Sequence, residues 1–242
     1  MLLEAKNVSR QFGAFFAVRD ASLSIAQGEI VGLIGPNGAG KSTFFNCLAG
    51  DMPPSAGQVI FDGQDVTFAP PETHALAGIG RTFQLPATFE DMTVLENVMV
   101  GAYLRHPHRN AARDRAMEVL EITELKDLAM QRARTLGTPG RKRLEIARVL
   151  ATSPRLMFLD EALAGLTPSE VQRAIGLVRR IHGMGITLVI VEHIMEVIMA
   201  LTERVIVFNQ GRVIAQGKPA DVVKDTQVIE AYLGSGRRKR RA

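Results

Sequence analysis

The chain has 242 residues, of which 46% are hydrophobic and 22% charged, a composition that is ordinary for a globular protein. Its length allows one large core, or one core with a small subdomain. No apolar stretch approaches the roughly 18 residues of a membrane span. The N-terminal "MLLEAKNVSR" lacks a signal-peptide pattern, so we expect the chain to stay in the cytoplasm.

The formal net charge of +4 arises at the C-terminal end of the chain. The tail "RRKRRA", from Arg237 to Ala242, carries five positive charges, and the rest of the chain is close to neutral. Such a run is most often a solvated chain end, so no nucleic-acid partner is expected. The single cysteine, Cys47, cannot form an internal disulfide, and its apolar neighbours predict a packed rather than a reactive thiol.

Strand-like segments occupy the first part of the chain. We expect strands over residues 2–8, 22–25, 30–34 and 58–61, the last of them ending at the turn Asp62-Gly63. A helix is expected over residues 42–48, directly after a glycine-rich segment. The glycines therefore lie where a buried strand turns into a helix.

That glycine-rich segment fits the pattern G-x-x-x-x-G-K-[ST]. Its residues are Gly35, Pro36, Asn37, Gly38, Ala39, Gly40, Lys41 and Ser42. In such a loop, backbone N–H groups cradle a phosphate at a helix N-terminus, while the lysine reaches the β- and γ-phosphates and the hydroxyl ligates Mg²⁺. A glycine-rich turn that merely contains a lysine should match by chance in about one chain in a hundred. The strand before it and the helix after it favour nucleotide binding.

The middle and the last part of the chain differ in character. Residues 93–135 show apolar positions three and four apart, which predicts a helical insertion. Strand–helix alternation then returns, with strands in 155–161 and 185–192, a helix after Thr167, a helix from His193 and a hairpin around Gln210-Gly211. Thr167 as N-cap, Pro168 in the first turn and Glu170 three residues after the cap mark the first of these helices.

Acidic groups follow the apolar run "LMFL". Because ligands of a doubly wound sheet bind beyond the carboxyl ends of its strands, Asp160 is placed to hold Mg²⁺ and Glu161 to polarise the attacking water. The alternative is a carboxylate pair that only starts a helix. His193 reaches the same edge after the run 186–191 and is a candidate for contacting the γ-phosphate or orienting the water, although a lone histidine is usually structural.

Together these motifs resemble the ATP-binding cassette (ABC) ATPases of membrane transporters over nearly the whole chain. "GPNGAGKST", Gly35 to Thr43, is similar to the Walker A motif, "LMFLDE" to Walker B and "AGLT" to the D-loop. By the same resemblance Glu161 is the catalytic carboxylate, His193 is the switch histidine and Phe12 stacks on adenine. Gln84 in "RTFQ" is the Q-loop glutamine, which touches Mg²⁺ and senses the membrane partner.

The resemblance also implies an architecture and cofactors. The fold class is α/β: a P-loop NTPase core with a mainly parallel sheet, an N-terminal antiparallel β subdomain and an inserted helical subdomain. The expected boundaries are 1–84 and 153–236 for the core, 85–152 for the helical subdomain and 237–242 for the basic tail. The cofactors are ATP and Mg²⁺, with Ser42, Gln84 and Asp160 as metal ligands.

One motif departs from the family pattern. The signature, normally Leu-Ser-Gly-Gly-Gln, contacts the ATP held by the other subunit of a dimer. Here the corresponding residues are Leu136, Gly137, Thr138, Pro139 and Gly140. The serine hydroxyl and one backbone N–H are lost, which is expected to weaken the partner's site rather than this chain's own, unless Thr138 supplies the hydroxyl.

Within the family, "RTFQ" and the segment 191–219 look most like ATPase subunits of branched-chain amino acid importers. The resemblance implies permease subunits and a second ATPase subunit as partners, a periplasmic binding protein acting indirectly, and a peripheral place on the cytoplasmic face of the membrane. Similar cassettes serve urea or amide uptake and lipopolysaccharide export. A soluble ATPase acting on nucleic acid or ribosomes and a nucleotide-gated regulatory cassette are alternatives from other classes.

Overall fold

The computed structural model describes residues 1–83 and 87–233. Its packing divides the chain into two compact units, one formed by Met1–Pro71 with the chain from Val189 onward, the other by Glu72–Leu188. The boundaries predicted for the core and the helical subdomain remain predictions. Within the described residues no helix combines the length and apolarity needed to cross a bilayer.

An antiparallel sheet forms the N-terminal part of the first unit, with the strand order β2-β1-β4-β5. Its strands are β1 (Leu3–Phe12), β2 (Phe15–Ile25), β4 (Ala56–Phe61) and β5 (Gln64–Asp65). β1 and β2 run much further than the apolar patterns predict. They pair from Leu3 opposite Ile25 to Phe12 opposite Phe15, so cross-strand hydrogen bonds carry them through exposed positions.

The other strands of the first unit neighbour one another in the order β10-β9-β3-β8. They are β3 (Ile30–Ile34), β8 (Thr187–Val191), which begins in the second unit, β9 (Arg204–Asn209) and β10 (Arg212–Gly217). β3 pairs with β9 in parallel, and the β9–β10 hairpin confirms the predicted turn at Gln210-Gly211, where both residues have positive φ.

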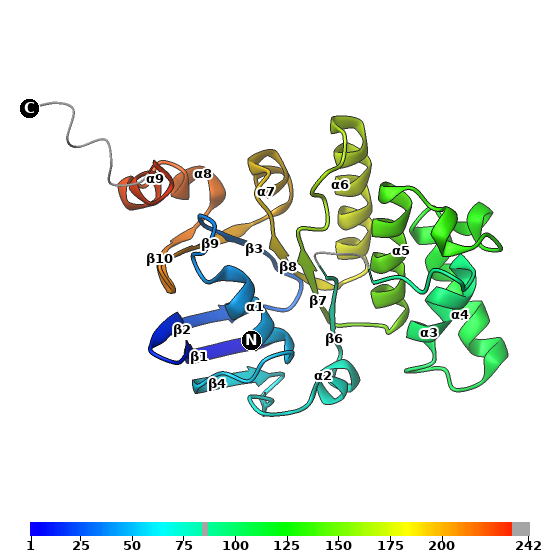
Figure 1. Cartoon of the computed structure of the whole chain (residues 1–242), viewed down its shortest axis with the longest axis horizontal. Coiled ribbons are helices and arrows are strands. Elements are labelled where there is room, and N and C mark those ends of the chain that lie inside the picture. The colour runs from blue at the N-terminus through cyan, green and yellow to red at the C-terminus, as the bar shows by residue number, and fades with distance from the viewer. Residues whose placement is uncertain (84–86, 234–242) are drawn as a thin grey trace, which may run out of the picture. The chain divides into compact units, whose positions relative to one another are not determined.

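Helices complete this unit: α1 (Lys41–Ala49), α7 (Met195–Leu201), α8 (Pro219–Val222) and α9 (Thr226–Leu233) (Figure 1). α7 begins two residues after the predicted start at His193. A buried apolar cluster joins strands and C-terminal helices. Its members are Ile34, Ile198, Val205, Val207, Val222 and Val228. The C-terminal helices are thereby packed against the strand that leads into the glycine-rich loop.

The second unit has parallel strands of its own. β6 (Ile79–Arg81) pairs in parallel with β7 (Leu156–Asp160), whose five residues are all buried. Its helices are α2 (Pro71–Ala77), α3 (Val94–Ala102), α4 (Arg109–Ile122), α5 (Thr138–Ala151) and α6 (Pro168–Gly183), with 3₁₀ turns η1 (Lys126–Leu128) and η2 (Ala133–Thr135). The helical insertion and the capping box of Thr167 with Glu170 are confirmed.

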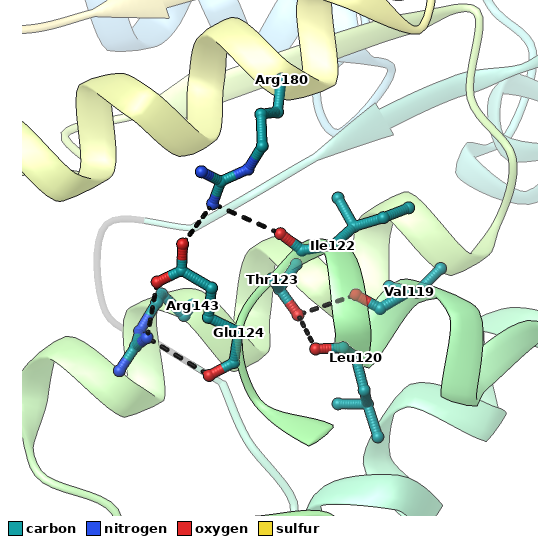
Figure 2. Close-up of polar contacts among 7 residues, drawn as sticks. All are labelled: Val119, Leu120, Ile122, Thr123, Glu124, Arg143 and Arg180. Atoms are coloured by element: carbon teal, nitrogen blue, oxygen red, sulfur yellow. Dashed lines mark hydrogen bonds and ion pairs between the residues drawn. The ribbon is translucent and has the colours of Figure 1, made fainter. Parts of the chain in front are cut away.

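A charged link ties the end of α4 to two other helices (Figure 2). The Glu124 carboxylate accepts a hydrogen bond from Arg180 of α6 at 2.7 Å and forms an ion pair with Arg143 of α5 at 3.7 Å. The Glu124 carbonyl oxygen also accepts from Arg143 at 3.4 Å. These contacts hold the helical insertion against α6 within the second unit.

Candidate nucleotide site

At two positions of the glycine-rich loop between β3 and α1, the backbone adopts a conformation that only glycine tolerates. Gly35 and Gly40 have φ of 145° and 100°. A Cβ on Gly35 would lie 2.1 Å from the carbonyl oxygen of Phe208, and one on Gly40 would lie 2.2 Å from that of Ala17. The loop therefore runs directly against neighbouring backbone, which gives it one defined shape.

Lys41 provides the positive charge of this loop. Its ammonium donates hydrogen bonds to the carbonyl oxygens of Gly35 at 2.7 Å and Pro36 at 3.0 Å, and the residue is only 6% exposed. Gly40, the N-cap of α1, has no side chain to cap the helix, and the positive end of the helix dipole attracts an anion to this N-terminus. Ser42 is exposed beside them. This arrangement suits a polyphosphate.

The loop is supported by the β9–β10 turn, a contact that the sequence analysis missed. The backbone N–H of Gly211 donates to the carbonyl oxygen of Ala39 at 2.8 Å, and the carbonyl oxygen of Gly211 accepts from the backbone of Arg19 at 2.8 Å. Only backbone atoms take part, so no side-chain signal in the sequence could have revealed this role. Gly211 therefore braces the phosphate loop.

Two further predicted residues belong to the same unit. Phe12 ends β1 with 45% of its surface exposed, and the Arg10 guanidinium lies over its ring, 4.9 Å from the centroid. His193 is exposed between β8 and α7, directly after the buried Glu192. Both side chains are accessible to a ligand, as the predicted roles require.

The predicted metal ligand Asp160 ends β7 in the second unit and is 6% exposed. Its carboxylate lies 3.7 Å from the guanidinium of Arg81, and its backbone N–H donates to the hydroxyl of Thr82 at 3.1 Å. The Thr82 N–H in turn donates to the carbonyl oxygen of Phe158 at 2.9 Å. Neighbouring strands thus fix the carboxylate, whose hard oxygen atoms, like the Ser42 hydroxyl, suit Mg²⁺.

Glu161 adopts a left-handed backbone conformation, with φ of 47°. This conformation is uncommon for a residue with a side chain and is typical of functional positions. The ammonium of Lys142, on α5, donates to the Glu161 carbonyl oxygen at 3.0 Å. A residue of the helix that begins with the signature segment therefore positions the peptide of the predicted catalytic carboxylate.

Glu145 is a buried acid that the sequence analysis did not select. Its carboxylate accepts a hydrogen bond from the backbone N–H of Phe83 at 2.6 Å. Burial raises the pKa of Glu145, and the Phe83 hydrogen bond together with the positive charges of Arg148, Lys142 and Arg81 opposes that rise. The sequence feature that could have identified Glu145 is a single acid within the basic helical run "RKRLEIAR".

The signature segment begins α5. Leu136 is buried, Gly137 is the N-cap without a side-chain hydrogen bond, and Thr138 is exposed in the first turn. Residues of this segment line a cavity of about 370 Å³ together with residues of α6. Glu124 and Arg143, shown in Figure 2, also line it. The predicted Gln84 lies outside the described residues.

Comparison with known proteins identifies the family. The family described as ABC transporter matches residues 18–164, and the one described as branched-chain amino acid ATP-binding cassette transporter matches residues 212–237. The chain belongs to the ATP-binding cassette family and is an ABC-type ATPase subunit. This confirms the resemblance drawn from the Walker motifs and implies nucleotide binding.

Several curated relatives span almost the same length. The chain is 35% identical to BraF of Pseudomonas aeruginosa, a high-affinity branched-chain amino acid transport ATP-binding protein, covering 96% of this chain and 98% of BraF. It is 36% identical to LivG of Escherichia coli K12, which has the same description and the same coverage. It is also 35% identical to LptB of E. coli K12, a lipopolysaccharide export system ATP-binding protein, over 96% of this chain and 97% of LptB.

Solved structures confirm the fold. A nucleotide-free ATP-binding cassette from an ABC transporter superposes with a TM-score of 0.88 at 30% identity, covering 96% of this chain and 99% of that one. The ADP conformation of an ATP-binding cassette gives 0.87 at 31% identity, covering 96% and 98%. The predicted α/β cassette fold is therefore correct.

Proposed function

We propose that this chain binds MgATP and hydrolyses it to energise the import of branched-chain or other amino acids. The observation that carries the nucleotide part is the phosphate loop, with Lys41 buried against its carbonyl oxygens and an uncapped helix N-terminus behind it. The substrate class rests on the named relatives BraF and LivG and on the match at residues 212–237.

The proposed roles follow the chemistry of each group. The phosphates are bound by Gly35, Pro36, Asn37, Gly38, Ala39, Gly40, Lys41, Ser42 and Thr43. Ser42, Asp160 and Gln84 would hold Mg²⁺, which when bound would neutralise charge on the phosphates. Phe12 stacks on the adenine.

Hydrolysis needs a group that accepts a proton from the attacking water, and Glu161 has this role. His193 contacts the γ-phosphate or orients the water. Leu136, Gly137, Thr138, Pro139 and Gly140 act in trans on the ATP of a second ABC ATPase subunit. Permease subunits complete the transporter, and a periplasmic binding protein acts through them. This chain lies on the cytoplasmic face of the membrane.

The catalytic assignment is tested by two substitutions. Glu161→Gln should keep MgATP affinity and lower turnover by roughly 10²-fold or more, because the amide cannot accept the proton of water. Lys41→Ala should instead weaken binding of the triphosphate. A Glu161→Gln variant that turned over ATP at the wild-type rate would show that another group polarises the water.

The similarity to LptB makes lipopolysaccharide export the second candidate. The two functions differ in the membrane subunits that co-purify with the chain and in what stimulates the complex. Amino acid with a binding protein should stimulate ATP hydrolysis by an importer, whereas lipopolysaccharide should stimulate an exporter. Purifying the native complex and measuring its ATPase rate with each compound separates the two.

A further inference from the structure

Glu145 is the only acidic residue of α5 and is 6% exposed. An acid at such a depth is rare unless it is paired, because moving a carboxylate out of water is costly. Its carboxylate accepts the backbone N–H of Phe83 at 2.6 Å, a short charge-assisted contact. Phe83 directly precedes Gln84 in the chain. Glu145 therefore anchors the signature helix to the strand end that leads into the Q-loop.

Three cations act on this carboxylate: Arg81, Lys142 and Arg148. Two of them also contact Walker B residues. The guanidinium of Arg81 lies 3.7 Å from the Asp160 carboxylate, and the Lys142 ammonium donates to the Glu161 carbonyl oxygen at 3.0 Å. One buried anion is therefore shared by the cations that position the predicted metal ligand and the predicted catalytic carboxylate.

The third cation, Arg148, contacts residues that follow Gln84 in the chain. The Arg148 guanidinium donates to the Ala87 carbonyl oxygen and lies over the ring of Phe89, 4.5 Å from its centroid. Arg81 stacks in the same way on Phe83, at 4.6 Å. Phe83 and Phe89 are 47% and 44% exposed. Both phenylalanines are thus accessible to a partner, and each is held by an arginine that Glu145 attracts.

We propose that Glu145 is a positioning residue that transmits a displacement of Phe83 or Phe89 to Asp160 and Glu161. Displacement of Phe83 or Phe89 by a membrane subunit changes the arginine positions around the carboxylate. Because the same carboxylate attracts Lys142 and Arg81, which contact Glu161 and Asp160, that change reaches both Walker B residues. This inference rests on the proposed function, since it requires a membrane partner that docks near the Q-loop.

The test compares the ATPase rate of the isolated chain with that of the complex purified with its native membrane subunits. Glu145→Gln keeps an acceptor for the Phe83 N–H but removes the charge that the three cations share. We expect the ratio of complex to isolated rates to fall about tenfold, within the usual range of allosteric coupling. MgATP affinity, measured by titration, should change by less than about twofold, because Glu145 belongs to the second unit and the phosphate loop belongs to the first.

Two control variants make the result specific. Glu145→Asp keeps the charge and should retain more of the stimulation than Glu145→Gln, a pattern that mere loss of packing does not produce. Glu118→Gln removes an exposed acid of α4 that pairs with Arg115 and should leave the ratio at the wild-type value. Arg148→Gln combined with Glu145→Gln should lower the ratio no further than either change alone.

The possible failures are distinct. A wild-type chain that is not stimulated by any co-purified membrane subunit overturns the proposed function and this inference with it. A stimulated wild type with an equally stimulated Glu145→Gln variant overturns only the role of Glu145. If Glu145→Gln does not fold, an Arg148→Gln variant with full stimulation overturns it.

Discussion

The ammonium of Lys142 donates a hydrogen bond to the backbone carbonyl oxygen of Glu161 at 3.0 Å, and Glu161 has a left-handed backbone with φ of 47°. The left-handed region disfavours side chains by roughly 1–2 kcal/mol, so such a residue persists where its surroundings hold it. The helix that carries the signature segment thereby fixes the position of the Glu161 backbone, from which the carboxylate side chain extends.

Replacing Lys142 by methionine should slow hydrolysis without weakening nucleotide binding. Methionine keeps most of the aliphatic stem but lacks the donor. A hydrogen bond from a charged donor is worth about 1.5–3 kcal/mol, and each 1.4 kcal/mol lost from the transition state is about tenfold in rate. We therefore expect kcat to fall about tenfold or more in a steady-state ATPase assay, with KM little changed.

The matched control is Lys126→Met, which removes an exposed lysine that pairs with Glu121. It should keep the wild-type kcat, because exposed ion pairs contribute little. Equal rates for Lys142→Met and Lys126→Met would contradict a positioning role for Lys142.

Alanine at Gly40 should disrupt the phosphate loop. Its Cβ would meet the Ala17 carbonyl oxygen at 2.2 Å, and rigid backbone atoms cannot give way as a side chain can. We expect nucleotide affinity to fall by more than about tenfold in a titration with a fluorescent ATP analogue, since a displaced loop loses several phosphate donors at once.

Gly13→Ala separates this clash from the effect of positive φ alone. Gly13 also has positive φ, 57°, but a Cβ there meets nothing within 4 Å. Its substitution should lower the free energy of unfolding by about 1 kcal/mol and leave nucleotide affinity unchanged. If both alanine variants bound the analogue equally well, the close approach at Gly40 would have no functional meaning.

Restoring the family signature should increase the turnover of the isolated chain. The lost serine hydroxyl and backbone N–H are donors to phosphate, each worth about 1.5–3 kcal/mol, so Gly137→Ser with Pro139→Gly should raise the ATPase rate about tenfold or more. The thermal unfolding temperature should hardly change for Gly137→Ser alone. Serine in place of an N-cap glycine raises the free energy of unfolding by only a few tenths of a kcal/mol.

Gly140→Gln is best added last. A Cβ at Gly140 would lie 3.2 Å from the Cβ of Leu136, so this side chain must shift before glutamine fits. No gain in rate from the first two changes would mean that Thr138 and the remaining backbone already suffice. The isolated chain would then not depend on a partner with an intact signature.

Cys47 should resist alkylation in the folded protein. Burial raises its thiol pKa to about 11, against a partial lowering by the charge of Arg10, and the residue is 2% exposed. At pH 8 a rise of about two units leaves roughly 10²-fold less thiolate than an unperturbed thiol has. Iodoacetamide labelling followed by mass spectrometry should therefore be at least that much slower than in concentrated urea.

Local chemistry in the sequence determined much of this protein. The phosphate loop was predictable because a glycine-rich turn, a lysine and a hydroxyl residue follow one another at fixed spacing between a strand and a helix. The start of α6 was predictable because Thr167, Pro168 and Glu170 interact within one turn. The turn at Gln210-Gly211 was predictable from two adjacent residues.

Tertiary structure decided the contacts between distant segments. Phe83 and Glu145 are 62 residues apart in the sequence, and no periodicity states which cation meets which acid. The full length of β1 and β2 came from pairing with each other rather than from their apolar pattern. Hydrogen-bond and charge partners depend on which chain segments pack together, and a side chain's own sequence neighbours carry no record of that.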